Sequence, residues 1–264
     1  MVNIVKKLTK YGTYVVMVVL LVQLSHIAMQ LARYSGQSMP GFSQYIARLF
    51  SGAVRRQRGN HLEIPYEWLS VQILYVLGLC GMITSDFNDS IGWIKICRKN
   101  RLYWWNQKVL ALFLYSTEFF IVLYGLTGLF AFFLGERGRT YSQIWIQDYG
   151  NHSVFRYSII CQIILEYMIC FLMGLFHLVL EMYTRSVFSV FISLSLILLS
   201  IFPDVCRYSF FQLTMFSWNY ERLCKIEAGQ RVLFGILFPV CITGGIISVL
   251  YFLGRKKGSK IEFY

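Results

Sequence analysis

Long apolar runs are the feature that most restricts how this chain of 264 residues can fold. Six runs approach or exceed the length that a helix needs to cross a hydrocarbon core of about 30 Å. They cover about residues 11–32, 68–85, 109–134, 157–182, 187–203 and 232–254. Apolar residues make up 56% of the chain and charged residues only 14%, which leaves too little polar surface for a water-soluble globule. We therefore expect an all-α polytopic membrane protein with six transmembrane helices in a single domain over residues 1–264.

The distribution of lysine predicts how such a bundle is oriented. If the N-terminus is inside, every lysine except Lys225 is cytoplasmic. The inside lysines are Lys6, Lys7, Lys10, Lys95, Lys99, Lys108, Lys256, Lys257 and Lys260. The arginines of residues 48–58 argue for the opposite orientation, but they lie in a long loop away from the ends of the runs, where the positive-inside rule has less weight. We expect both termini to be cytoplasmic, with outer loops at 33–67, 135–156 and 204–231.

Two of these outer loops contain patterns of their own. In the first, Phe42, Tyr45, Ile46 and Leu49 recur at helical spacing, which predicts a short amphipathic interfacial helix. Such a helix either lies on the outer membrane face, where it can contact a peptide or a partner, or plugs the outer end of the bundle. The loop at 204–231 is dense in aromatic residues, which favours a segment that dips into the interface. Cys206 and Cys224 share this loop, and the sequence leaves open whether they pair.

Motifs for catalysis or metal binding are missing from the sequence. It contains no G-x-x-x-x-G-K-[ST], no H-E-x-x-H and no G-x-S-x-G pattern. We therefore expect no catalytic residues, no metal ligands and no ATP site in this chain. The net charge of +12 is not accompanied by a nucleic-acid-binding motif, so anionic lipid and a cytoplasmic subunit are the expected counterparts.

Three ionisable side chains fall inside the apolar runs: Glu118, Glu166 and His177. Such groups cost a few kcal/mol or more at bilayer depth, so they are expected to face the bundle interior or water. One interpretation is a polar patch along the path of a cationic substrate. The alternative is that each group is protonated or satisfied by a neighbouring hydroxyl. Glu181 is four residues after His177 and is expected to pair with it near the cytoplasmic edge.

The last run contains a proline and a glycine pair. Pro239 is expected to kink the helix because it removes one backbone hydrogen bond. Gly244 and Gly245 are expected to let a neighbouring helix come close.

The segment between the second and third runs, residues 85–108, is strongly basic. A helix begun at Asp89 or Ser90 would have Ile91, Ile94 and Trp105 along one side, with the basic residues mostly elsewhere. This pattern predicts a basic helix on the membrane surface that a cytoplasmic partner can push on. The alternative is a solvated positive loop that only fixes the topology.

This segment and the predicted layout together resemble the permease subunits of type-2 ABC exporters. The resemblance is to bacteriocin or lantibiotic export and immunity permeases of Gram-positive bacteria. Asp89-Ser90-Ile91-Gly92, then Arg98-Lys99-Asn100-Arg101, then Trp104 to Lys108 look like the family's approach to its third span. The short turn between the fourth and fifth runs and the aromatic outer segment before the sixth are also similar.

The resemblance implies a membrane subunit that is energised by a separate cytoplasmic ATP-binding subunit, which holds ATP and Mg²⁺. Residues 85–108 would be the coupling loop, with Asp89, Arg98, Lys99 and Arg101 as the contacts. It further implies a second permease, identical or related, and a bacterial plasma membrane location. The expected substrate is a hydrophobic or cationic peptide taken from the membrane.

Two other functions remain open at this point. One is an energy-independent immunity or accessory protein that binds a peptide toxin at its outer loops, using the long arginine-bearing first loop. The other is an intramembrane enzyme using Glu118, Glu166 or His177, for which no paired-residue motif exists.

Overall fold

A computed structural model describes most of the chain, and every element in the described part is helical or a turn. The described residues are 20–27, 29, 42–52, 64–84, 101–134, 152–184, 186–202, 210–227 and 232–259. The helical elements are α2 (Phe42–Leu49), α3 (Tyr66–Gly78), α6 (Arg101–Leu134), α8 (His152–Glu181), α9 (Ser186–Leu199), η1 (Phe210–Thr214), α11 (Phe216–Glu227) and α12 (Val232–Ser259). Within this part of the chain the predicted all-α class is confirmed.

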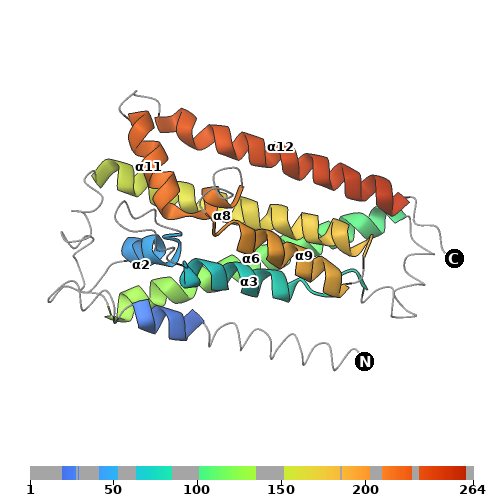
Figure 1. Ribbon diagram of the computed structural model, residues 1–264, viewed down its shortest axis with the longest axis horizontal. Coiled ribbons are helices and arrows are strands. Elements are labelled where there is room, and N and C mark those ends of the chain that lie inside the picture. The colour runs from blue at the N-terminus through green and yellow to red at the C-terminus, as the bar shows by residue number, and fades with distance from the viewer. Residues whose placement is uncertain are drawn as a thin grey trace.

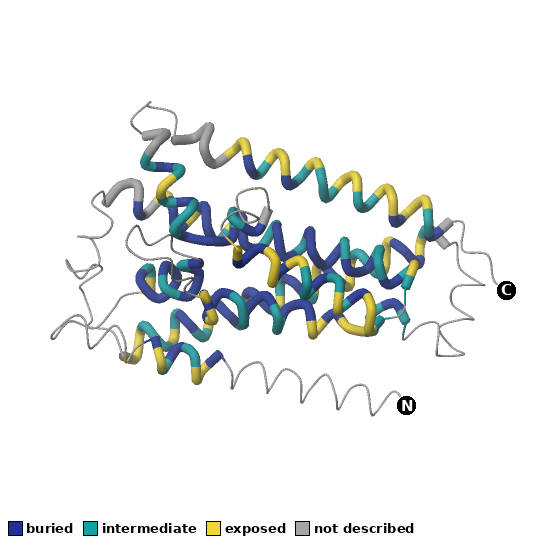
Figure 2. Tube along the Cα trace, viewed as in Figure 1, coloured by how far each residue is buried: buried dark blue, intermediate teal, exposed yellow. Residues whose placement is uncertain are grey.

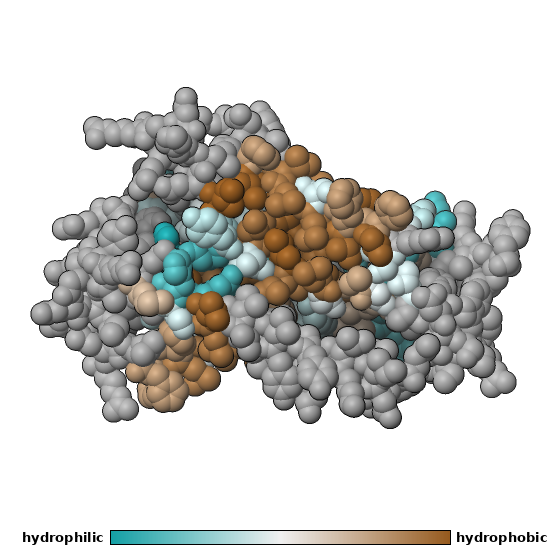
Figure 3. All heavy atoms as spheres, turned by 60° about the horizontal axis from the view of Figure 1, so that its bottom comes forward, coloured by the Kyte–Doolittle hydropathy of each residue, from teal (hydrophilic) through white to brown (hydrophobic). Residues whose placement is uncertain are grey.

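Three helices are long and apolar enough to cross a membrane. The qualifying stretches are Leu102–Phe133 in α6, Tyr157–Glu181 in α8 and Leu237–Gly258 in α12. At 1.5 Å per residue, the 28 residues of α12 measure about 42 Å, which exceeds a hydrocarbon core of about 30 Å. Large apolar side chains are exposed along these helices, and Figure 3 shows a broad hydrophobic area over the middle of one face. These features indicate a membrane protein.

The predicted set of six spans is not confirmed. The helices in the second and fifth runs, α3 and α9, have only 13 and 14 residues, or about 20 Å each. The chain leaves α3 at Gly78 and turns through residues 79–83, with Gly81 in the left-handed region at φ 81°. Apolar residues such as Leu79 and Ile83 form this turn, so hydropathy alone counts it as helix. Of the first run, 11–32, the structure describes only residues 20–27 and 29, which are helical.

The helices run back and forth along one axis (Figure 1). α3, α8 and α12 run in one direction, and α6 and α9 run in the other. α8 is the central helix, since 56% of the residues in its apolar stretch are buried, against 28% for α6 and 17% for α12. Figure 2 shows the same difference in burial, with buried residues along α8 and mostly exposed ones along α12.

Glycines allow α6 to lie directly against two other helices. A Cβ on Gly174 of α8 would lie 2.5 Å from Leu112 Cδ1, and one on Gly254 of α12 would lie 2.1 Å from Trp105 Cζ2. The close approach expected at Gly244 and Gly245 is not observed among the described residues: the nearest neighbouring atom to a Cβ on Gly244 is 3.9 Å away, and no described atom lies within 4 Å of one on Gly245. α12 contacts α6 closely at its end instead of its middle.

One end of the bundle is closed by a cap formed by residues 42–52 and 210–227. The helix predicted in the first outer loop is confirmed as α2, and five of its eight residues are buried, so it packs into the bundle end. Its C-terminal turn pairs with the start of α11 through Phe216 N–H to Phe50 O at 2.6 Å and Ser217 N–H to Ser51 O at 3.3 Å. Burial also raises the pKa of Tyr45 in α2, which keeps its phenol neutral.

Candidate functional site

The predicted site residues fall into two groups in the structure. Asp89, Arg98 and Lys99 lie outside the described residues, and Arg101 is the first residue of α6. The three candidates for a substrate path all lie in long helices: Glu118 in α6, and Glu166 and His177 in α8. Their surroundings differ from one another.

Glu166 is completely buried and accepts hydrogen bonds from two helices. Gln72 Nε2 of α3 donates to Glu166 Oε1 at 2.5 Å, and Gln162 Nε2, one turn earlier in α8, lies 3.4 Å from Oε2. Cys170 Sγ, one turn later, lies 3.6 Å from Oε1. A buried carboxyl is tolerated when its oxygens are satisfied in this way. We call Gln72, Gln162, Glu166, Cys170 and Asn219 the Glu166 network.

The Glu166 network continues into the cap. Gln162 Nε2 also donates to the backbone oxygen of Thr214 in η1, and Asn219 Nδ2 of α11 donates to Gln162 Oε1 at 2.7 Å. Trp68 Nε1 of α3 donates to Thr214 Oγ1 at 2.8 Å. The amide residues of this network were missed in the sequence. The sequence feature that could have identified them is an uncharged amide inside an apolar run, as for Gln72 and Gln162.

Glu118 lies at the level of Glu166 but points the other way. The hydroxyls of Thr117 and Tyr167 are 3.1 Å apart, which sets the two carboxyl-bearing residues at the same level of α6 and α8. Glu118 is exposed on the outside of α6, whereas Glu166 is buried. None of the described residues forms a hydrogen bond or ion pair with the Glu118 carboxyl. The structure therefore does not bring these two candidates together.

His177 and Glu181 lie near the opposite end from the cap and bind different elements. His177 Nδ1 is 3.2 Å from Ser193 Oγ of α9. The Glu181 carboxylate accepts from Ile83 N–H and from Thr84 Oγ1, each at 2.9 Å, in the turn after α3. No His177–Glu181 ion pair occurs among the described residues. Glu181 instead holds the turn after α3, where the buried backbone N–H of Ile83 needs an acceptor.

The end of the bundle opposite the cap is basic and held together by side-chain contacts. Lys108 Nζ donates to Met82 O at 2.6 Å, which ties the start of α6 to the turn after α3. At the same end, Tyr251 OH of α12 donates to Asn106 Oδ1 at 2.8 Å. Lys257 Nζ lies 4.5 Å from the centre of the Tyr183 ring. We call residues 79–84, 101–108, 181–184 and 251–258 the basic end.

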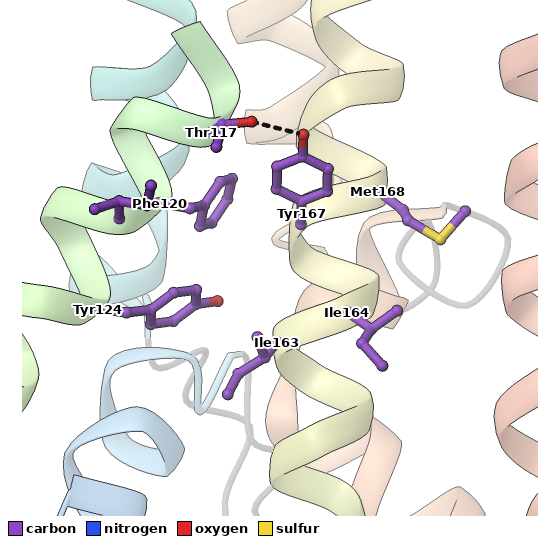
Figure 4. Close-up of a pocket in the computed structure, with 8 residues that line it drawn as sticks. Thr117, Phe120, Tyr124, Ile163, Ile164, Tyr167 and Met168 are labelled. Carbon is purple, nitrogen blue, oxygen red and sulfur yellow. Dashed lines mark hydrogen bonds between the residues drawn. The ribbon is translucent and has the colours of Figure 1, made fainter. Parts of the chain in front are cut away.

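An apolar groove of about 590 Å³ lies between α6 and α8 (Figure 4). Its lining residues are Thr117, Phe120, Ile121, Tyr124, Ile163, Ile164, Tyr167 and Met168. The hydroxyls of Thr117 and Tyr167 bond to each other, so the groove offers mainly apolar contact. The described part of the chain contains no group of three or more His, Cys, Asp or Glu side chains that could hold a metal ion. The groove is suited to an acyl chain or an apolar side chain.

Comparisons of the chain with protein-family models, with curated proteins and with solved structures find no match.

Proposed function

We propose that the chain is the membrane-spanning permease subunit of an ATP-driven transporter of the type-2 ABC exporter kind. A separate cytoplasmic ATP-binding subunit docks on the segment at 85–108 and supplies ATP and Mg²⁺. The transported molecule is a hydrophobic or cationic peptide taken from the membrane. The sequence pattern of this segment, described above, and the basic end of the bundle support this proposal.

The anchoring of the basic end is the observation that carries the proposal. The described chain stops at Thr84 and resumes at Arg101, the first residue of α6, so residues 85–100 connect these two points. Glu181 of α8 fixes the outgoing chain at Ile83 and Thr84, and Lys108 of α6 binds the same turn at Met82 O. A partner that moves this segment therefore pulls on α3, α6 and α8 together.

Such coupling matches the requirement of a transporter whose energy source is on another chain. ATP-driven closure of the partner would rock the helices attached to the segment, as in rigid-body switching of domains. The Glu166 network links α3, α8 and α11, so movement of α3 against α8 must break or carry the bond from Gln72 to Glu166. The network is thus a candidate two-state element between the basic end and the cap.

Affinity purification of the tagged protein from its native host in mild detergent tests the proposal. We expect an ATP-binding subunit to co-purify and to hydrolyse ATP. The triple variant Arg98→Ala, Lys99→Ala, Arg101→Ala is expected to lose this partner, because it removes three positive charges from the docking segment.

The matched control is Arg255→Ala, Lys256→Ala, Lys257→Ala, which removes the same charge from α12 at the same end. This control is expected to keep the ATPase. Loss of the partner in both triple variants would mean that the ATPase responds to positive charge in general and not to the docking segment. Recovery of the chain without any ATPase across several detergents would contradict the proposal.

The closed cap favours a second candidate function, an energy-independent immunity or accessory protein that binds a peptide toxin. α2, η1 and α11 form a folded surface at the end of the bundle that is predicted to face outward, and hydrogen bonds between residues 50–51 and 216–217 tie its parts together. Protection against the toxin in a strain without any candidate ATPase would favour this function over transport.

A further inference from the structure

The basic end of the bundle carries more positive than negative side chains. Its one acidic residue is Glu181, against five basic residues: Arg101, Lys108, Arg255, Lys256 and Lys257. The Glu181 carboxylate is buried and already accepts from Ile83 N–H and Thr84 Oγ1. Arg255 and Lys257 form no ion pair with any described residue. The described part of the chain therefore does not neutralise these two cations.

Three of the basic residues follow one another at the point where α12 leaves its apolar stretch. The residues from Leu237 to Leu253 include no charged side chain and span about 25 Å, close to the thickness of a hydrocarbon core. Arg255, Lys256 and Lys257 come directly after this stretch and Gly254, and we call them the α12 cations. Helical side chains lean toward the N-terminus of their helix, so these side chains lean back toward the apolar stretch. Their charges are therefore expected at the level of the lipid headgroups.

An exposed apolar surface leads up to Lys256 on one side of α12. Phe252 and Leu253 precede Lys256 by four and three residues, and Val249 lies one turn earlier. The side chains of Phe252, Leu253 and Val249 are 60%, 51% and 57% exposed, in that order. A bilayer lipid presents the matching chemistry, an acyl chain followed by a headgroup.

The end of α12 is packed against the turn after α8. A Cβ on Gly258 would lie 3.7 Å from Met182 Cε, and Lys257 Nζ lies 4.5 Å from the centre of the Tyr183 ring. Tyr183 is itself 63% exposed. The ring face attracts the ammonium group, and a lysine has three N–H donors, so Lys257 still has donors for an anion. The turn after α8 thus positions one of the α12 cations.

We propose that the α12 cations, with Tyr183 beside them, bind the headgroup of an anionic phospholipid of the surrounding bilayer. The phosphate oxygens accept from the guanidinium and ammonium groups, and an acyl chain lies along the exposed side of Phe252. A free phosphate ion would use the charges alone. The apolar surface beside the charges is what selects a lipid as the source of the phosphate.

This site is separate from the segment on which the ATP-binding subunit is proposed to dock. That segment, residues 85–108, ends in the first turns of α6, whereas the lipid site lies on the last turn of α12. Tyr251 of α12 donates to Asn106 of α6, one turn before the α12 cations. A lipid bound there therefore also holds the end of α12 against the start of α6. The inference needs a membrane but no ATPase.

Native mass spectrometry of the purified chain, titrated with phosphatidylglycerol or phosphatidylcholine, tests the site. The first phosphatidylglycerol is expected to bind at least roughly tenfold more tightly than phosphatidylcholine, which has no net charge. The triple variant Arg255→Ala, Lys256→Ala, Lys257→Ala is expected to lose this preference. Equal binding of the two lipids by the unaltered chain, or an unchanged preference in the variant, would overturn the proposal.

The matched control is Arg98→Ala, Lys99→Ala, Arg101→Ala, which removes the same charge from the docking segment. It is expected to keep the affinity for phosphatidylglycerol within about twofold. Equal losses in the two triple variants would show attraction to net positive charge without a site, and the proposal would fail. Co-purification of the ATPase is measured on the same two variants and is expected to show the opposite pattern, so failure of the lipid site and failure of the proposed function are separated.

The Tyr183 ring is tested with a conservative and an aliphatic replacement. Tyr183→Phe keeps the ring face and is expected to keep the affinity for phosphatidylglycerol, whereas Tyr183→Leu weakens it about two- to fivefold. Equal affinities of the two variants would remove Tyr183 from the site. An excess of inorganic phosphate is expected to leave the lipid bound, and its displacement would indicate a site for free anions instead.

Photo-crosslinking in native membranes identifies what covers this side of α12. A photoreactive amino acid replaces Phe252, and we expect a product with a phospholipid that carries an anionic headgroup. The same amino acid at Leu237, 50% exposed at the other end of the apolar stretch, is the control and is expected to show no preference for anionic lipid in liposomes of uniform composition. A product of the Phe252 variant with another protein, or with another part of this chain, would contradict the lipid site.

Discussion

At the scale of single residues, Glu118 and Glu166 show how much the direction of a side chain matters. Both are glutamates inside apolar helices at one level of the bundle, yet Glu166 is buried among amide donors and Glu118 is exposed. We predict that Glu166→Leu lowers the free energy of unfolding by about 1–3 kcal/mol, because it leaves the buried amide of Gln72 without its acceptor.

Thermal unfolding in detergent measures this prediction. Val249→Leu is the control, and it is expected to change stability by less than about 0.5 kcal/mol because this apolar side chain is exposed on α12. The double variant Gln72→Leu, Glu166→Leu should cost less than the sum of the two single variants, since both partners of one bond are removed together. Additive losses would show that the bond from Gln72 to Glu166 contributes little.

Gly254 provides a second residue-scale prediction. Gly254→Ala is expected to lower stability by about 1–3 kcal/mol, because the added Cβ overlaps the Trp105 ring and must push α12 away from α6. Gly245→Ala, in open space on the same helix, is expected to leave the unfolding temperature unchanged or slightly raised. Equal unfolding temperatures for the two variants would mean that α12 does not depend on this contact.

The sequence predicted which residues are unusual but not which way they point. Glu118, Glu166 and His177 were identified because charged groups are rare inside apolar runs. Periodicity could not decide their direction, since α6 and α8 are apolar on nearly all sides and lack a polar stripe. The bonds of Glu166 come from α3 and α8 itself, and the network reaches α11, far away in the sequence. Only the packed structure shows that these residues meet.

At the scale of elements, the cap is the part whose packing the sequence described least. The helical spacing of Phe42, Tyr45 and Ile46 correctly predicted α2, and of the two predicted positions the structure shows the one in which α2 packs into the end of the bundle. The partner segments, η1 and α11, come more than 150 residues later in the chain. The helix and its apolar side could therefore be predicted from local spacing. The hydrogen bond between Phe216 and Phe50 could not, because the two residues are far apart in the sequence.

Trp68 is predicted to hold the cap on the bundle. Trp68→Phe removes the hydrogen bond to Thr214 Oγ1, so backbone amides of residues 210–227 are expected to exchange with solvent roughly fivefold faster, which corresponds to about 1 kcal/mol. The matched control is Trp105→Phe at the basic end, where the indole N–H has no hydrogen-bond partner among the described residues. Hydrogen exchange read by mass spectrometry compares the two. Unchanged exchange in the cap would show that apolar packing alone holds it.

At the scale of the whole molecule, the sequence predicted the three long helices and their order, whereas six membrane crossings stay a prediction. Hydropathy correctly indicated α6, α8 and α12, whose length and composition are sufficient to cross a bilayer. It failed to separate helix from apolar turn in the second and fifth runs. The turn after α3 and the end of α9 at Leu199 are formed by residues as apolar as the helices before them.

The shortness of α3 and α9 has a consequence for the surrounding bilayer. The two helices are neighbours, with Cys80 Sγ 3.3 Å from Ser186 Oγ, and each is about 20 Å long, while α12 on another side is about 42 Å long. If α3 and α9 face lipid, the bilayer must thin on their side, at a cost of fractions of a kcal/mol per Å of mismatch. We expect the unfolding temperature in lipid discs to be highest with short acyl chains and to fall as the chains lengthen. A steady rise with chain length would instead mean that this side is covered by protein. If the unfolding temperature falls as the chains lengthen, the molecule is expected to concentrate in the thin regions of its membrane.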